Sequence, residues 1–210
     1  MGRTRVKICG LTRPSDAVAA CEAGADAIGL VFYPPSSRNL SPECAREISS
    51  AVPPFVQRVG LFVDADPELV REMIVEADLD LLQFHGNESA GYCESFGRGY
   101  IKSLAMKPGV DPATVFSQHP AARGFLLDTY HPARPGGTGE TFNWDLFPHT
   151  SGRPLILAGG LTADNVTEAI RACTPYAVDV SGGVESTPGI KSAEKIRAFI
   201  RQVRMSGDLL

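Results

Sequence analysis

Short apolar segments alternate with longer amphipathic segments along the chain, and this alternation limits the possible folds more than any other feature. Runs rich in β-branched and aliphatic residues predict eight strands, at Arg5–Cys9, Ala27–Phe32, Val56–Val63, Leu79–Phe84, Gly99–Leu104, Arg123–Asp128, Pro154–Ala158 and Ala177–Val180. Helices are predicted between them, near residues 14–22, 42–51, 67–77, 88–95, 112–119, 143–149, 163–172 and 191–203. Strands separated by helices form β-α-β units, so the sheet should be parallel.

Two features favour a sheet closed into a barrel over an open sheet. An open dinucleotide-binding sheet needs G-x-G-x-x-G after its first strand, and the sequence has no such motif there. Glycine-rich turns instead follow the last three predicted strands, and a (β/α)8 barrel builds its phosphate site after strands 7 and 8. We therefore predict one α/β domain over residues 1–210, a (β/α)8 TIM barrel of near-minimal size.

Local signals mark where several of the predicted helices begin and end. Three of them start with a capping oxygen followed by proline, at Ser41-Pro42, Asp66-Pro67 and Asp111-Pro112. Gly24 lies where the first helix should end, because glycine adopts the left-handed conformation of a helix C-cap without strain.

Composition argues against several classes of protein and partner. The formal net charge is −4, so no basic surface predicts nucleic acid or anionic lipid as a partner. The first residues lack the apolar core of a signal peptide, and no segment approaches the ~18 apolar residues of a membrane helix. The five cysteines form no C-x-x-C pair, which argues against a disulfide framework or a zinc site. We expect a cytoplasmic protein.

The alternation of strand side chains predicts which residues face the barrel axis. Val6 and Ile8 should pack against helices, which leaves Lys7 and Cys9 facing inward. The same reasoning places these residues inside: Arg58, Gly60, Phe62, Gln83, His85, Lys102, Asp128 and Asp179. Strands 1 and 8 are neighbours in a closed barrel, so Lys7 should pair with Asp179. Cys9, His85 and Asp128 end their strands and should reach the C-terminal mouth, where barrel enzymes keep their chemistry.

Cys9 and Asp128 are the candidates for proton transfer at this mouth. Lys7 lies on the same face as Cys9, and a nearby cation favours a thiolate that can remove a proton or attack a substrate. The alternative is that Cys9 only packs as a small buried side chain. Asp128 would act as a general acid, or it could serve as a cap or loop anchor. A base and an acid on strands 1 and 6 leave room for a sugar between them.

Other residues at the same end predict a site for an anionic ligand. Gly159-Gly160 and Gly182-Gly183 follow the last two strands, and glycine lets backbone N–H groups approach a phosphate closely. The alternative is that these glycines only form tight turns. Arg38, in the loop after the second strand, could clamp a substrate carboxylate or simply be solvated. His85 is expected to support the base or the substrate.

Two further expectations concern mobility and metal. The glycine-rich loop after the sixth strand, Thr129 to Thr141, is long for so compact a chain and predicts a lid. The histidines show no metal-ligand spacing, so no metal is expected.

Seven stretches of the sequence together resemble one family. They are VKICGLT, GADAIGLVFYPPSSRNLSP, RVGLFV, LLQFHGNE, LLDTYHPARPGGTGETFNW, LAGGLTADNV and AVDVSGGVESTPGIK, which run from Val6 to Lys191 and fall at nearly every predicted strand end. This pattern resembles the phosphoribosylanthranilate isomerase family of tryptophan, and hence aromatic amino-acid, biosynthesis.

The resemblance implies an aldose–ketose isomerase that needs no cofactor. The implied reaction is the Amadori rearrangement of N-(5-phosphoribosyl)anthranilate to 1-(2-carboxyphenylamino)-1-deoxyribulose 5-phosphate. Carried over by motif, Cys9 would be the general base and Asp128 the general acid. Arg38 would contact the anthranilate carboxylate, and the glycine turns after strands 7 and 8 would hold the phosphate.

Alternatives remain open from the sequence. One is a dual-substrate barrel that also isomerises the histidine-pathway aminoaldose. Such enzymes typically carry aspartate where this chain has Cys9, and no half-barrel repeat is visible here. Another is a non-catalytic barrel that only binds a phosphorylated metabolite. The protein is expected to be a monomer or a homodimer.

Overall fold

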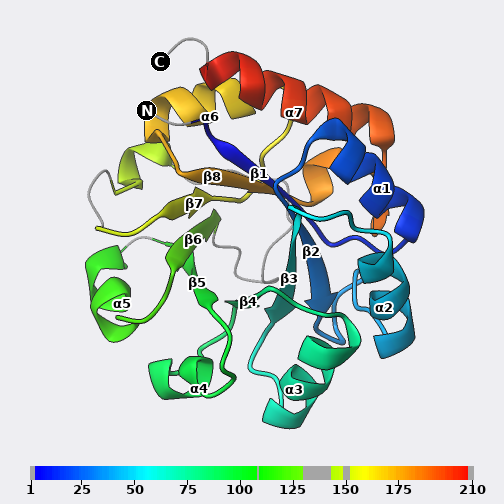
Figure 1. Ribbon diagram of the computed structural model, residues 1–210. Coiled ribbons are helices and arrows are strands. Elements are labelled where there is room, and N and C mark those ends of the chain that lie inside the picture. Colours follow the sequence, from blue (N-terminus) through cyan, green and yellow to red (C-terminus); the bar gives the residue numbers. More distant parts are fainter. Residues whose placement is uncertain (1–2, 108, 130–142, 149–151, 208–210) are drawn as a thin grey trace.

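Eight parallel strands form a closed barrel in the order of the chain (Figure 1). The computed structural model describes all residues except 1–2, 108, 130–142, 149–151 and 208–210. The strands are β1 (Arg5–Cys9), β2 (Ala27–Phe32), β3 (Gln57–Phe62), β4 (Leu81–Phe84), β5 (Tyr100–Met106), β6 (Gly124–Thr129), β7 (Leu155–Leu157) and β8 (Ala177–Val180). β8 pairs with β1 and closes the ring. The predicted (β/α)8 barrel is confirmed.

Helices surround the barrel, and most begin where the sequence predicts. They are α1 (Pro14–Ala23), α2 (Pro42–Ser50), α3 (Pro67–Glu76), α4 (Ala90–Glu94), α5 (Pro112–Gln118), α6 (Val166–Cys173) and α7 (Ala193–Gly207). The side chains of Ser41, Asp66 and Asp111 each accept a backbone N–H of the helix that follows, as expected of N-caps. Gly24 ends α1 in the left-handed conformation, with φ of 96°.

Some of the predicted helices differ from what is observed: α4 begins at Ala90 rather than 88, and α6 at Val166 rather than 163. The segment predicted as a helix over 143–149 contains one 3-10 turn, η1 (Trp144–Leu146), within its described residues. The last helix begins at Ala193 rather than 191, because a second 3-10 turn, η2 (Gly182–Val184), and a small antiparallel hairpin come first. This hairpin joins β9 (Glu185–Thr187) to β10 (Ile190–Lys191) through Pro188 and Gly189.

The inward-facing residues were predicted correctly for β1, β4, β6 and β8 but incorrectly for β3 and β5. Cys9 lies opposite Gly29, and Gly29 lies opposite Val59, so Val59 faces the axis and Arg58, Gly60 and Phe62 face outward. The Phe62 ring contacts Phe84, which packs against α4.

The outward-facing charged side chains have their own partners. Arg58 pairs with Asp78 and Asp80, just before β4. Lys102 lies beside Phe84 and its Nζ is 3.0 Å from Glu88 Oε2. The alternation rule failed here because a parallel barrel strand is buried on both faces, so polarity does not reveal which face is inner.

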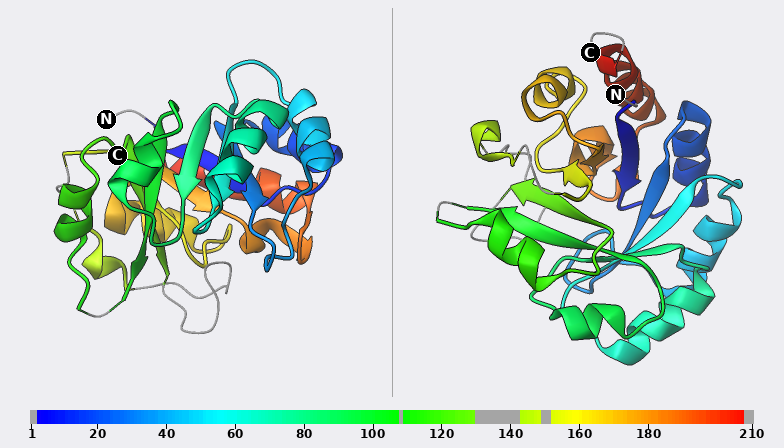
Figure 2. Two further views of the ribbon diagram at one scale, coloured as in Figure 1. Left: turned by 90° about the horizontal axis from the view of Figure 1, so that it is seen from below. Right: turned by 60° about the vertical axis from the view of Figure 1, so that its left-hand side comes forward.

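The outer layer closes where the two ends of the chain meet. α7 packs against both α1 and α6, so the last helix covers the junction between β8 and β1 (Figure 2). Its buried apolar side chains are Ile196, Phe199, Ile200 and Val203. Among the described residues, no helix is both long and apolar enough to span a bilayer.

Candidate active site

Asp128 lies near the carboxyl end of β6, where the sequence places it, and is held from two sides. Its Oδ1 accepts the backbone N–H of Thr129 at 2.8 Å. Its Oδ2 lies 3.4 Å from His85 Nε2, close enough for an ion pair when the ring is protonated. His85 Nδ1 in turn lies 3.0 Å from Gln83 Nε2, which fixes the ring. The structure therefore brings the predicted His85 and Asp128 together, with the histidine supporting the carboxyl group.

Cys9 ends β1 and is buried in the barrel, with 4% of its surface exposed. A β-carbon on Gly29 would lie 2.6 Å from Cys9 Sγ, so the glycine on the neighbouring strand makes room for the thiol. Lys7 precedes Cys9 by two residues on β1 and points to the same side of the strand. It donates a hydrogen bond of 3.0 Å to Asp179 Oδ1. The predicted Lys7–Asp179 pair is confirmed.

Burial and the charge of Lys7 shift the pKa of the Cys9 thiol in opposite directions. Burial raises the pKa of the Cys9 thiol, Lys7 lowers it, and the net result is a pKa above the usual value. Burial alone would lower the pKa of Lys7, but Asp179 and Cys9 together raise it. The expectation that Lys7 favours the thiolate is therefore correct in sign, but burial outweighs it and the protonated thiol is the favoured form at neutral pH.

A pocket of about 70 Å³ opens at the carboxyl ends of β6, β7 and β8. Its lining combines both predicted glycine pairs with the candidate acid and residues around them: Asp128, Ala158, Gly159, Gly160, Leu161, Thr162, Asp179, Val180, Ser181, Gly182 and Gly183. In the described part of the chain, the N–H groups of Gly159 and Gly160 donate no hydrogen bond, which leaves them available to an anion. The pocket has the size and the donors to hold a phosphate group.

One glycine of this pocket has no space for a side chain. A β-carbon on Gly183 would lie 1.9 Å from the backbone oxygen of Leu161, so the turns after β7 and β8 touch through their main chains. Close packing of two backbones is what brings the two glycine turns into a single pocket.

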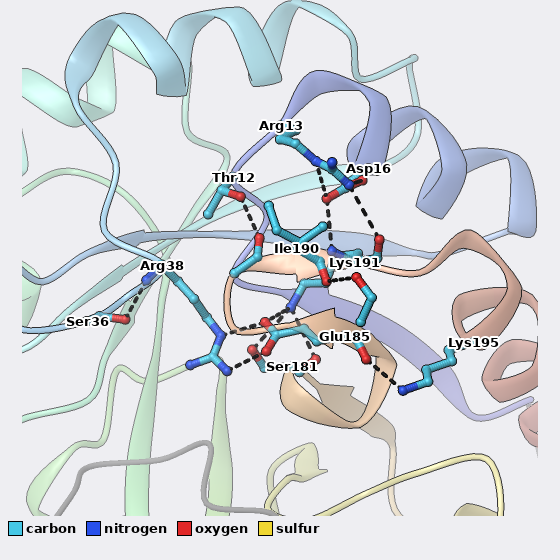
Figure 3. Close-up of polar contacts among 12 residues, drawn as sticks. Thr12, Arg13, Asp16, Ser36, Arg38, Ser181, Glu185, Ile190, Lys191 and Lys195 are labelled. Atoms are coloured by element: carbon cyan, nitrogen blue, oxygen red, sulfur yellow. Dashed lines mark hydrogen bonds and ion pairs between the residues drawn. The ribbon is translucent and has the colours of Figure 1, made fainter.

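Arg38 reaches toward Cys9 from the loop after β2, but it is not simply solvated. Its Nε and Nη2 donate to the two carboxylate oxygens of Glu185 at 2.7 and 2.8 Å (Figure 3). A β-carbon on Gly10 would lie 2.4 Å from Arg38 Cδ, so the arginine lies over the loop that follows Cys9. The structure thus places Arg38 next to the candidate base, on the side of the mouth opposite Asp128.

Three residues around Arg38 were not singled out from the sequence. Glu185 binds Arg38, Lys191 binds Glu185, and Ser181 accepts from Lys191. They lie in the β9–β10 hairpin and the turn before it, within the stretch SGGVESTPGIK. The Pro188-Gly189 pair is the signal that could have predicted the hairpin, because this pair is typical of a tight turn.

Two further predictions about this end of the barrel stay predictions. The predicted lid, Thr129 to Thr141, lies outside the described residues apart from Thr129. Within the described residues, no three His, Cys, Asp or Glu side chains gather closely enough to hold a metal ion.

Fold and site together define a class: a (β/α)8-barrel enzyme whose polar groups gather at the carboxyl ends of its strands. The comparison with family models then specifies the family. The model described as N-(5'phosphoribosyl)anthranilate (PRA) isomerase matches residues 6–202. This chain belongs to that family.

Individual relatives agree with this result along nearly the whole chain. An N-(5'-phosphoribosyl)anthranilate isomerase of Pseudomonas paraeruginosa strain PA7 is 55% identical over 207 residues, covering 99% of this chain and 98% of the relative. The crystal structure of phosphoribosyl anthranilate isomerase from Thermotoga maritima has a TM-score of 0.88 at 41% identity, covering 96% and 99% of the two chains. A structure of the isomerase in complex with reduced 1-(o-carboxyphenylamino)-1-deoxyribulose 5-phosphate has a TM-score of 0.83 at 38% identity, with the same coverage.

Proposed function

We propose that this chain is an isomerase of tryptophan biosynthesis that converts N-(5'-phosphoribosyl)anthranilate into 1-(2-carboxyphenylamino)-1-deoxyribulose 5-phosphate. The observation that carries the proposal is the pocket at the barrel mouth. The carboxyl group of Asp128 lines the same pocket as both glycine turns. A sugar phosphate held there by its phosphate would therefore present its ring to an acid.

The proposed reaction transfers protons between the substrate and two side chains. Asp128 protonates the furanose ring oxygen, the bond between C1 and this oxygen breaks, and C1 becomes an iminium of the anthranilate nitrogen. The Cys9 thiolate then removes the proton from C2, which gives a neutral enolamine. The Cys9 thiol returns a proton to C1, and the C2 hydroxyl gives its proton to the Asp128 carboxylate as the ketone forms, so both side chains regain their starting states. Positioned acids and bases contribute about 10²–10⁴-fold each to such steps.

The other side chains hold the substrate in this proposal. His85, 3.4 Å from Asp128, keeps the acid directed toward the mouth. The N–H groups of Gly159, Gly160, Gly182 and Gly183 bind the phosphate, and Arg38 binds the carboxylate of the anthranilate ring. We further propose that the protein acts in the cytoplasm, as one domain over residues 1–210, without cofactor or metal. Its state, monomer or homodimer, stays a prediction.

A turnover assay with the purified protein tests the function. Loss of the anthranilate fluorescence of N-(5'-phosphoribosyl)anthranilate should follow Michaelis–Menten kinetics. The histidine-pathway aminoaldose, offered under the same conditions, should not be converted. Absence of turnover with the first substrate would reject the proposal in favour of a binding protein, and conversion of both substrates would identify a dual-substrate enzyme.

A further inference from the structure

Two cations share one carboxylate beside the proposed base. Glu185 accepts both Arg38 donors, and its Oε1 also accepts Lys191 Nζ at 2.8 Å (Figure 3). The three side chains are withdrawn from water: Arg38 is 17% exposed, Glu185 7% and Lys191 0%. We call Arg38, Glu185 and Lys191 the charge triad.

The charge triad carries one unbalanced positive charge. The remaining contacts of Lys191 Nζ are neutral, to Ser181 O at 3.1 Å and Ser181 Oγ at 3.3 Å. Asp16, another carboxylate that contacts the hairpin, is engaged by the backbone N–H of Lys191 and by Arg13. A buried charge without a partner is unfavourable, so an anion that reaches this site from the mouth would be bound strongly.

The orientation of Arg38 shows where that anion would bind. Glu185 occupies Nε and Nη2, the side edge of the guanidinium group. Within the described residues Nη1 donates to no partner, so the end edge, Nη1 with the second hydrogen of Nη2, is available for a planar carboxylate. Ser181, which contacts Lys191, also lines the phosphate pocket. A ligand with a phosphate and a carboxylate can therefore reach both sites.

The position of Lys191 is fixed through its backbone rather than left to a flexible loop. Its N–H donates to Asp16 Oδ2 at 3.0 Å, and the preceding turn is held by Thr12 Oγ1, which donates to Gly189 O at 2.5 Å. The hairpin is thus attached to the loop after β1, the same loop that follows Cys9 (Figure 3). Such anchoring is expected of a group that must hold a charge at one place.

We propose that Lys191 determines specificity for the carboxylate of the substrate. By sharing Glu185 with Arg38, it leaves one positive charge at the mouth that the anthranilate carboxylate neutralises. This inference rests on the proposed function, because it takes its carboxylate from that substrate. Lys191 acts through Glu185 and Arg38 and is a positioning residue, not a catalytic one.

A pair of ligands that differ only in the carboxylate tests the inference. The first is reduced 1-(o-carboxyphenylamino)-1-deoxyribulose 5-phosphate, and the second is the same compound built on aniline. In Lys191→Met, calorimetry should show that the first ligand binds about tenfold more weakly than to the wild type. The affinity for the second ligand should change by less than about twofold, because it has no carboxylate to interact with the positive charge that was removed. The inference would be overturned if the affinities for both ligands fell equally, or if neither affinity fell.

Lys195→Met is the matched control. Lys195 donates to the backbone oxygen of Glu185 at 2.7 Å, so the variant removes a like charge nearby and leaves the side-chain contacts within the charge triad intact. It should leave both affinities unchanged, and a loss equal to that of Lys191→Met would contradict the proposal.

A second variant covers the case in which Lys191→Met does not fold. Lys191→Gln removes the charge but keeps a donor for Ser181, and it should show the same selective loss. The wild-type protein separates this inference from the proposed function. If it neither turns over N-(5'-phosphoribosyl)anthranilate nor prefers the carboxylated ligand, the function fails; if it does both and the Lys191 variants keep that preference, only the inference fails.

Discussion

At the scale of the residue, Cys9 shows how burial and charge compete at a single atom. The thiol needs a protected position to take a proton from carbon, and this protection raises its pKa. Lys7 acts in the opposite direction but is also engaged by Asp179. The proposed base is therefore present mainly as a thiol at neutral pH and gains activity as it ionises.

This balance predicts how the reactivity of the Cys9 thiol depends on pH. A raised pKa means that the thiolate accumulates only as the pH rises, so alkylation of Cys9 by iodoacetamide should accelerate between about pH 7 and about pH 9 rather than level off near neutrality. Mass spectrometry of the Cys9 peptide, followed over time across this range, would measure it. Cys93→Ser is the control, because Cys93 is equally buried but belongs to α4, and its profile should match the wild type. A plateau already reached at neutral pH would contradict the account.

The sequence predicted the positions of individual functional residues better than it predicted which residues contact them. Cys9 and Asp128 lie at the ends of strands with a clear apolar pattern, and the four glycines follow such strands. Their height along the barrel axis could therefore be deduced. The ion pair of Arg38 with Glu185 joins residues 147 positions apart, and no local pattern records such a contact. The pairing of Lys7 with Asp179 was predictable at a separation of 172 only because closure of the barrel makes β1 and β8 neighbours.

At the scale of the element, the turns after β7 and β8 depend on backbone contact that side-chain patterns do not reveal. The sequence predicted the position of both glycine pairs but not the contact between the two turns that contain them. The structure supplies it at Gly183, which touches the main chain of Leu161. The facing of β3 and β5 could not be deduced either, since both sides of these strands are buried.

The contact at Gly183 predicts the effect of adding one methyl group. In Gly183→Ala the new β-carbon would lie 1.9 Å from Leu161 O, so the turn must move and the phosphate donors move with it. Binding of ribulose 5-phosphate, measured by calorimetry, should weaken at least about tenfold, and urea unfolding should show a loss of about 1–3 kcal/mol.

Gly91→Ala provides the comparison for this experiment. A β-carbon at Gly91 meets nothing within 4 Å, and the residue is in α4, where alanine is the better helix former by about 1 kcal/mol. Binding should be unchanged. Wild-type affinity in Gly183→Ala would show that the turn is not part of a phosphate site.

At the scale of the whole molecule, the order of elements was predictable because apolar runs and helix starts repeat along the chain. The hairpin before α7 was not predicted, because its strands are short and carry no alternation, and Pro188-Gly189 is the only local signal that marks its turn. α7 itself completes the outer layer by packing on α1 and α6. The barrel and the surrounding layer of helices therefore both close at the junction of β8 and β1. A substitution that disrupts packing there should destabilise the entire fold.

Phe199→Ala tests whether this junction supports the whole molecule. Phe199 is fully buried in α7, and truncation should reduce the free energy of unfolding by about 3–5 kcal/mol. Circular dichroism and tryptophan fluorescence, followed in urea, should shift together. Met205→Ala in the same helix removes a side chain of a residue that is 54% exposed and should cost less than about 0.5 kcal/mol. Loss of α7 alone, with the barrel signal unchanged, would contradict a shared closure.

The most direct test of the central claim is kcat for N-(5'-phosphoribosyl)anthranilate in Cys9→Ala and Asp128→Asn. Neither change removes a contact that holds the barrel together, so both proteins should still bind reduced 1-(o-carboxyphenylamino)-1-deoxyribulose 5-phosphate. The account predicts that kcat falls by at least about 10²-fold in each variant, because each loses a proton-transfer group. A kcat near that of the wild type in either variant would contradict the claim that this thiol and this carboxyl group carry the reaction.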